Sequence, residues 1–261
     1  MTAGVEYREQ GPIATITLSR PDRLNALTFD IYAELCELFS TIAKSSSIRA
    51  VIVTGTGRGF CSGGDVDEII GRLVTREMPE LLAFTRMTGA LVRGIRACPK
   101  PVIAAINGIA AGAGAVIALA CDFRIASENA SLAFLFTKVG LAGADMGAAY
   151  LLPRIIGLGR ATELLLLGDV VPAEAAQRVG LVTSVVAPDI LMTETERLAR
   201  RLAEGPSFAL GMTKQLLNAE LDMDFAAAIE AEAEGQAICM KTRNFREFYD
   251  AFVGKRRPEF D

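Results

Sequence analysis

The sequence of 261 residues contains no histidine and no tryptophan. The absence of imidazole excludes histidine-ligated metals, Ser-His or Cys-His catalytic pairs and histidine proton shuttles. Any acid–base chemistry must therefore use Asp, Glu, Lys, Tyr or Cys. We expect no metal site and look instead for a carboxylate whose surroundings raise its proton affinity.

A strong excess of charge of either sign is also missing. The chain has 27 basic and 31 acidic residues, a net charge of -4 and a pI near 5.2. This balance gives no whole-molecule attraction to nucleic acid or to an anionic membrane, although a local basic cluster for a small anion stays open.

Signals for membrane insertion or export are weak. Residues 101–121 carry no charge until Asp122, but Pro101 and several glycines interrupt them, so we expect a buried strand, a glycine loop and a buried helix. The first ten residues show neither a signal peptide nor a transit peptide. The five cysteines share no metal spacing and are expected to be reduced thiols. We therefore expect a cytoplasmic protein.

Strand and helix patterns alternate over the first 200 residues, and helices dominate after them. This order predicts an α/β core in residues 1–200 and a helical region in residues 201–261. The expected strands cover residues 13–18, 50–53, 102–106, 123–125, 132–134 and 181–186. The expected helices cover residues 29–43, 80–97, 112–121, 159–167, 173–179, 190–204, 207–219, 225–241 and 243–253.

One acid, Asp145, lies in a segment that is otherwise apolar or neutral, residues 139–153. A carboxylate among Gly, Ala, Met and Leu loses water and keeps few partners, which raises its pKa. This is the condition for a general base near neutral pH. An apolar helix is expected from Met146, so an N-cap role for Asp145 is the alternative. A capping box would need Glu or Gln at Ala148, and neither is present.

Two glycine-rich segments, residues 59–65 and 107–115, each leave a strand and enter a helix. Glycine lets a ligand approach the peptide N–H groups, and N–H groups at a helix start carry partial positive charge. Two such donors on one oxygen form an oxyanion hole. Close helix packing explains the small residues of the second segment equally well. A dinucleotide fingerprint is disfavoured because no acidic residue ends a following strand.

Several motifs in order along nearly the whole chain resemble the crotonase (enoyl-CoA hydratase/isomerase) superfamily. They are Gly59-Phe-Cys-Ser-Gly-Gly-Asp65, Pro101-Val-Ile-Ala-Ala-Ile-Asn-Gly108, Gly112-Ala-Gly114, Cys121-Asp122 and residues 176–186, 205–217 and 252–260. The resemblance implies an α/β spiral of ββα units with a C-terminal helical trimerisation region. It also implies an acyl-CoA substrate that carries its own coenzyme A, no other cofactor, and a homotrimer or a dimer of trimers.

The resemblance also assigns roles to individual residues. The N–H groups of Ser62 and Ala113 would form the oxyanion hole. The remaining assignments are a CoA adenine site at Ser62, Gly63, Gly64, Asp65 and Val66, CoA phosphate contacts from Arg23, Lys255 and Arg256, and an acyl pocket of Val116, Phe136, Leu141, Met146, Leu73 and Leu82. Lys255 and Arg256 would reach a neighbouring subunit. Solvated surface charge is the alternative for the three cations, and plain helix packing is the alternative for Leu73 and Leu82.

Departures from the hydratase pattern bear on the reaction. Hydratases of this family use two glutamates, and the matching positions here hold Val116 and Phe136. Asp145, with Gly147 and the Leu-Leu-Pro-Arg sequence at 151–154, resembles instead the dienoyl-CoA isomerases and the ring-opening isomerase of phenylacetate breakdown. The resemblance implies that these isomerases use a single aspartate at this position. In the present chain, the loop before Asp145 is one residue longer than theirs. We therefore expect an acyl-CoA isomerase that moves a double bond or opens a ring epoxide.

Three other functions remain open. One is hydration with a different acid such as Glu128, which we expect to be a surface residue. Another is hydrolysis or substitution with Asp145 as the nucleophile, as in the dehalogenases of the superfamily, although those enzymes use histidine and tryptophan. The last is a non-catalytic scaffold that binds CoA thioesters or RNA. The acidic pI and the lack of a basic–aromatic stripe disfavour RNA.

Overall fold

The computed structural model describes residues 4–261, whose strands form two sheets. The six-stranded sheet has the order β1-β2-β3-β5-β7-β10, in which only the β1–β2 pair is antiparallel. Its strands are β1 (Val5–Gln10), β2 (Ile13–Leu18), β3 (Ala50–Gly55), β5 (Val102–Ile106), β7 (Phe123–Ser127) and β10 (Ser184–Val186). The four-stranded sheet contains β4 (Gly59–Cys61), β6 (Ile109–Ala111), β8 (Ser131–Ala133) and β9 (Val170–Pro172).

Successive pairs of strands place one strand in each sheet before the chain enters a helical segment. β3 and β4 form the first such pair, β5 and β6 the second, and β7 and β8 the third. The helices are α1 (Phe29–Lys44), α2 (Gly71–Leu73), α3 (Met78–Ala97), α4 (Ala113–Ala120), α5 (Ala148–Ile156), α6 (Leu158–Leu167), α7 (Ala173–Arg178), α8 (Leu191–Ala203), α9 (Ser207–Ala219), α10 (Phe225–Met240) and α11 (Arg243–Val253). This order confirms the predicted α/β spiral of ββα units.

Alternate residues of the strands in the large sheet point to opposite sides, and other elements cover both of its faces. Val51 and Val53 of β3 belong to the main core, which includes residues of α1, α3 and α4. Ala50 and Ile52 of the same strand pack instead against α8. The last turn of α8 packs with the core through Ala203, so the expected boundary near residue 200 falls inside this helix.

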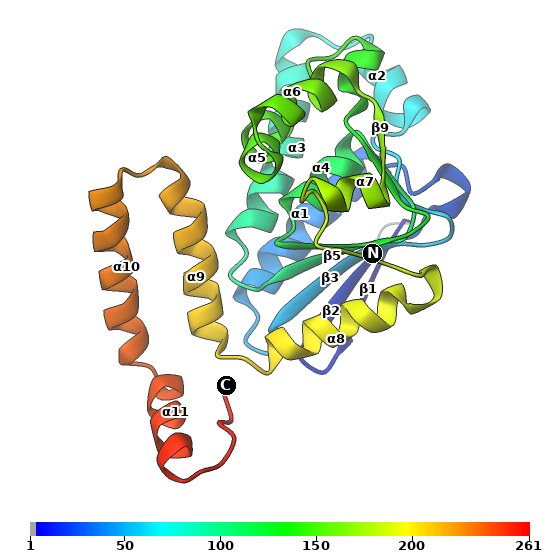
Figure 1. Ribbon diagram of the computed structural model, residues 1–261. Helices are drawn as coiled ribbons and strands as arrows, with labels where there is room; N and C mark the ends of the chain where they lie inside the picture. The colour runs from blue at the N-terminus through cyan, green and yellow to red at the C-terminus, as the bar shows by residue number, and fades with distance from the viewer. Residues whose placement is uncertain (1–3) are drawn as a thin grey trace.

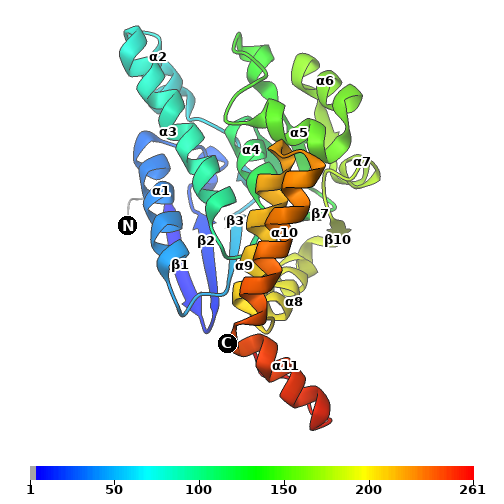
Figure 2. The same cartoon turned by 90° about the vertical axis from the view of Figure 1, so that its left-hand side faces the viewer.

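Helices α9, α10 and α11 form an arm beside the core (Figure 1). Figure 2 shows α9 and α10 side by side and α11 beyond them, next to the C-terminus. Lys214 fixes α9 to the core: its ammonium donates to the carbonyls of Ile95 and Lys100 and lies 2.8 Å from the Asp122 carboxylate. α10 and α11 carry many exposed apolar side chains, among them Phe225, Ile229, Ile238, Phe245, Phe248 and Phe252. The expected trimer stays a prediction.

The uncharged run at residues 101–121 forms β5, β6 and α4, of which the strand β5 and the helix α4 were expected, whereas β6 lies in the segment predicted to be a glycine loop. Every residue of α4 is buried inside the protein, because the helix packs against β4, β6, α3 and α5. Within residues 4–261, no helix combines the length and the apolar character needed to cross a bilayer.

Candidate active site

The first glycine-rich segment forms β4 and the turn that follows it. The N–H of Ser62 donates to the carbonyl of Leu24 at 3.0 Å, and its hydroxyl lies 3.3 Å from the carbonyl of Arg23. A peptide N–H has one proton, so Ser62 has no N–H to offer a ligand. The prediction that Ser62 contributes to an oxyanion hole is therefore wrong.

Gly64 presents the available N–H in this turn. Leu27 donates to the carbonyl of Gly63 and accepts from the N–H of Asp65, each at 2.8 Å, in a parallel bridge centred on Gly64. The backbone groups of Gly64 itself therefore point away from Leu27. The sequence shows the glycine pair but not its register against Leu27, and this register decides which N–H is available.

The two glycine-rich segments approach each other backbone to backbone. A Cβ on Gly63, whose φ is +100°, would lie 3.0 Å from the carbonyl oxygen of Ala111 and 3.5 Å from the nitrogen of Ala113. A Cβ on Gly114 would lie 2.2 Å from the carbonyl oxygen of Cys61. Ala113 is the first residue of α4, so its N–H has no acceptor within the helix. Ala113 thus stands beside the Gly63–Gly64 turn as a second donor.

Two asparagines hold the base of the first segment. Asn25 is 1% exposed, and its amide nitrogen donates to the carbonyls of Thr56 and Gly59 at 2.9 and 2.7 Å. Asn107 donates to the same Gly59 carbonyl at 3.0 Å. The sequence analysis missed Asn25. Its left-handed backbone, with φ of +57°, is a conformation that asparagine tolerates better than most residues, but no motif marks it.

Asp65 supports the loop with its carboxylate. The side chain is 2% exposed, accepts from the N–H groups of Glu68 and Asp67 at 3.1 and 3.0 Å, and lies 3.0 Å from the Arg20 guanidinium. The Glu68 N–H bond, with those of Asp67 and Arg20, lowers the pKa of Asp65 despite its burial. The prediction that Asp65 binds CoA is therefore wrong for its side chain. Val66, which follows it, is 72% exposed.

Asp145 lies half-buried in the turn before α5, and its Oδ1 accepts from the Met146 N–H at 2.8 Å. Burial raises the pKa of Asp145, and the Met146 bond offsets part of this rise. The helix does not begin at Met146 as expected: α5 begins at Ala148, Gly147 is its cap, and no side chain caps it. Met146 and Gly147 have φ of +51° and +88°, so the chain turns sharply after Asp145. The N-cap alternative for Asp145 is thus wrong.

The side chains expected to form the acyl pocket divide into an inner and an outer group. Val116, Phe136 and Met146 are buried in the same hydrophobic core. Leu82 and Leu141 are exposed, and Leu73 is half-buried. The positions where hydratases carry glutamates are therefore apolar and closed to water here. Glu128 is exposed, as expected.

The three cations expected to bind the CoA phosphates do not lie together in one chain. Arg23 is near the first glycine-rich loop, where its guanidinium lies 3.1 Å from the Asp67 carboxylate. Lys255 and Arg256 follow α11, which Figure 1 shows at the opposite end of the molecule from α2. Arg256 is bound to Glu247 through contacts of 2.6 and 2.9 Å. Any joint role for these cations requires a second copy of the chain.

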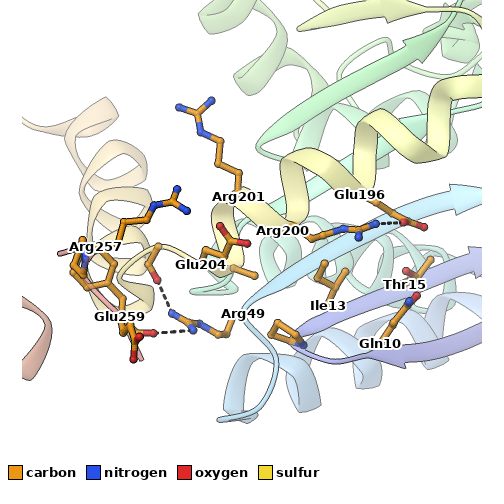
Figure 3. A pocket seen from close by; sticks show the side chains of 15 residues that line it. Gln10, Ile13, Thr15, Arg49, Glu196, Arg200, Arg201, Glu204, Arg257 and Glu259 are labelled. Carbon is orange, nitrogen blue, oxygen red and sulfur yellow. Dashed lines mark hydrogen bonds and ion pairs between the residues drawn. The ribbon is translucent and has the colours of Figure 1, made fainter.

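A cavity of about 840 Å³ lies elsewhere, between the ends of β1 and β2, α8 and the C-terminal tail (Figure 3). Arg49 crosses it and donates to the carbonyls of Gly205 and Phe260 at 2.5 and 3.2 Å. Arg200 is paired with Glu196 at 2.6 Å. None of the predicted site residues lines this cavity. Arg49 holds the tail and the junction between α8 and α9 in place, so we do not identify the cavity with the active site.

The sequence profile of the enoyl-CoA hydratase/isomerase family matches residues 8–261. The chain belongs to this family. It is 39% identical over 259 residues to the 1,2-epoxyphenylacetyl-CoA isomerase of Escherichia coli strain K12, covering 98% of this chain and 97% of that one. It is 35% identical over 261 residues to the short-chain-enoyl-CoA hydratase of Clostridium acetobutylicum, covering 98% and 96%.

Solved structures agree with the family assignment. A crystal structure from Streptomyces coelicolor A3(2), described as an enoyl-CoA hydratase, superposes with a TM-score of 0.97 at 52% identity and covers 99% of this chain and 94% of that one. The enoyl-CoA hydratase of Bacillus anthracis superposes with a TM-score of 0.92 at 30% identity, covering 98% of both chains. Members of the enoyl-CoA hydratase/isomerase family act on acyl-CoA thioesters, so the glycine turns described above belong to an acyl-CoA enzyme.

Proposed function

We propose that this member of the enoyl-CoA hydratase/isomerase family is an acyl-CoA isomerase whose single proton carrier is Asp145. The observation that supports this most strongly is the isolation of Asp145. It is a half-buried carboxylate with a raised pKa, while the two positions that would supply a hydratase with glutamates hold buried Val116 and Phe136. The E. coli relative named as an isomerase supports the same choice, whereas several relatives are named as hydratases.

The reaction follows from the backbone donors and the carboxylate. The thioester carbonyl oxygen accepts bonds from the N–H groups of Gly64 and Ala113, each worth about 3 kcal/mol in the transition state. Asp145 takes a proton from the α carbon, and the electron pair moves into the thioester as an enolate. The same carboxyl group then returns the proton to the γ carbon, and the double bond moves from the β,γ to the α,β position. No co-reactant is consumed, so one carboxylate is sufficient.

Replacement of the carboxylate tests this mechanism. Asp145→Asn keeps the size of the side chain and an acceptor for the Met146 N–H, but an amide cannot accept the α proton. We expect it to lower kcat/KM for a β,γ-enoyl-CoA by about 100-fold or more. The measurement is the rate of double-bond migration. Glu128→Gln, at an exposed acid, is the matched control and should behave as wild type. Full activity in Asp145→Asn would contradict the mechanism.

The substrate panel separates isomerisation from its rivals. Wild-type protein is offered β,γ-enoyl, α,β-enoyl, dienoyl and epoxide-bearing thioesters in oxygen-18 water. An isomerase moves double bonds, or opens the ring, without taking up the label. A hydratase incorporates oxygen-18 into the acyl chain and would overturn the proposal. A covalent ester on Asp145, detected by mass spectrometry of the quenched protein, would identify it as a nucleophile instead.

A further inference from the structure

Arg124 of β7 is a buried cation for which the proposed mechanism has no use. It is 8% exposed, and its guanidinium donates to backbone carbonyls. Nη1 contacts the carbonyl oxygens of Cys121, Leu119 and Ala118 at 2.5, 3.2 and 3.4 Å. Nε donates to the carbonyl of Leu181 at 2.8 Å. Burying a charge without an ionic partner is destabilising, so a neutral donor would serve these carbonyls at a lower cost.

The acid nearest to Arg124 in the chain, Asp122, is bound to other groups. Its carboxylate lies 2.8 Å from the Lys214 ammonium and 3.7 Å from the Arg96 guanidinium. The same carboxylate accepts from the N–H of Val102 at 2.8 Å. Arg124 belongs to none of the ion pairs formed within residues 4–261, so its charge is opposed only by the carbonyl dipoles that it contacts.

These carbonyls lie at the C-terminal end of α4, the helix whose first residue is Ala113. The helix has eight residues and is therefore about 12 Å long, at about 1.5 Å per residue. None of its side chains is polar, so other residues must satisfy its unpaired end groups. Arg124 does so at one end. At the other end, Ala113 faces Gly63 and the proposed position of the thioester oxygen.

The charge of Arg124 alters the electrostatic potential at the far end of α4. A helix carries roughly half a positive charge at its N-terminus and roughly half a negative charge at its C-terminus. The guanidinium cancels the negative end, and its remaining charge acts through a buried interior. At about 15 Å and an effective dielectric constant near 20, a unit charge favours an enolate oxygen by about 5- to 10-fold. It has little effect on a neutral carbonyl oxygen at the same distance.

We propose that Arg124 is a positioning residue for the oxyanion hole, which acts through α4 to hold the Ala113 N–H in place and to favour the enolate over the neutral thioester. The inference rests on the proposed function, because that function places the enolate oxygen beside Ala113 and Gly64. An arginine with a purely structural role would stabilise the fold without distinguishing the two forms of the ligand. The two roles therefore differ in what they do to an anionic ligand.

The first test measures the ionisation of a bound ligand. A 3-oxoacyl-CoA thioester loses its α proton to become an enolate, which absorbs in the near ultraviolet, whereas a saturated acyl-CoA of the same length stays neutral. Arg124→Gln removes the charge and keeps an amide donor. We expect it to raise the pH at which the bound 3-oxo ligand ionises by about 0.7 to 1 unit, the same 5- to 10-fold effect. Affinity for the saturated ligand should change by less than about 2-fold. In turnover, kcat should fall by about 5- to 10-fold with KM nearly unchanged.

Two further variants separate charge from stability. Arg124→Lys keeps the charge, so the bound ligand should ionise within about 0.3 pH unit of wild type even if the free energy of unfolding falls. Arg49→Gln is the matched control, because Arg49 also binds backbone carbonyls, those of Gly205 and Phe260, and should leave the ionisation unchanged. Unchanged ionisation in Arg124→Gln, or a shift of a full pH unit in Arg124→Lys, would overturn the inference. The Lys variant decides the question if the Gln variant does not fold.

The same titration in an Asp145→Asn background separates this inference from the proposed function. Ionisation of the bound ligand is an equilibrium and needs no proton carrier in the protein. If Asp145→Asn keeps full isomerase activity and Arg124→Gln still raises the ionisation pH, the proposed function fails and the role of Arg124 stands. If Asp145→Asn is inactive and Arg124→Gln leaves the ionisation unchanged, the role of Arg124 fails on its own.

Discussion

Asp65 and Asp145 are both carboxylates in glycine-rich turns, yet the structure moves their pKa values in opposite directions. Asp65 receives two backbone N–H bonds and an arginine, which together lower its pKa. Asp145 receives one N–H bond among apolar neighbours, and burial raises its pKa. The difference separates a carboxylate that stays charged and holds a loop from one that, in the proposed mechanism, gains and loses a proton.

The pKa of Asp145 is raised and that of Asp65 is lowered. We therefore expect that, as pH falls, activity is lost at a higher pH than the folded structure. Protonated Asp145 cannot accept a proton, so kcat/KM should fall as pH drops through its raised pKa, above the ordinary aspartate value of about 3.9. Asp65 has a depressed folded pKa, so its contribution to stability is complete above the unfolded value and is lost only as pH falls through the folded one. The measurements are kcat/KM and far-ultraviolet circular dichroism against pH. The prediction would be contradicted if kcat/KM and the circular dichroism signal fell at the same pH, or if kcat/KM did not fall in acid at all.

The sequence pointed to Asp145 as the candidate carboxylate but did not point to Gly64 as the residue with the available N–H. A lone acid among apolar residues can be recognised from a single sequence, because its surroundings in the fold consist largely of its neighbours in the sequence. The choice between Ser62 and Gly64 depends on a bridge to Leu27, more than thirty residues away in the chain. If the register of this segment against Leu27 shifted by two residues, the composition and the motif would stay the same. A different residue would then present the available N–H.

At the scale of elements, the long helices were predictable, whereas several strands, including the six-residue β1, were not. Helix α1 begins after Thr28, whose hydroxyl accepts the Ile31 N–H at 3.3 Å, and helix α3 ends before Pro99, both as expected. Strands β4, β6 and β9 have only three residues each, too few to show an alternating pattern, and the sequence analysis missed them. Of the four strands in the second sheet, only β8 was expected from the sequence, near residues 132–134.

The contact between β4 and α4 predicts a sharp difference between two glycine substitutions. Gly114→Ala places a methyl group 2.2 Å from the Cys61 carbonyl oxygen, so the two glycine-rich turns must separate. We expect a loss of about 1 to 3 kcal/mol in the free energy of unfolding, together with a large fall in kcat. Gly159→Ala in α6 meets nothing within 4 Å and should change stability by less than about 1 kcal/mol. Urea unfolding and steady-state kinetics measure both, and equal effects would refute the tight packing.

For the whole molecule, the arm presents apolar side chains that one chain leaves uncovered. Phe252 on α11 is 74% exposed, and other aromatic residues of α10 and α11 are also exposed. Exposed apolar surface of this extent marks a site of association. The family resemblance supplies the expectation that a trimer, or a pair of trimers, covers it. Two copies or more would also bring Lys255 and Arg256 to a neighbouring active site.

We predict that the arm mediates self-association and that Phe252 is part of the contact. Phe252→Asp places a charge in the surface that other copies would cover, and we expect it to shift the protein toward monomer. Phe252→Tyr keeps the ring and is the matched control, expected to retain the wild-type mass. Size-exclusion chromatography with light scattering measures both. A monomeric wild-type protein, or an unchanged mass in Phe252→Asp, would exclude the arm as the interface.

The ion pair between Lys214 and Asp122 has a consequence for how such an assembly is built. Lys214 is only 7% exposed and is also bound to two core carbonyls, while Gly211 brings α9 against the backbone of Pro99. The root of the arm is thus rigid before any other copy arrives. In the expected trimer, the direction in which α9 leaves the core would consequently be set inside each protomer before the outer surfaces meet.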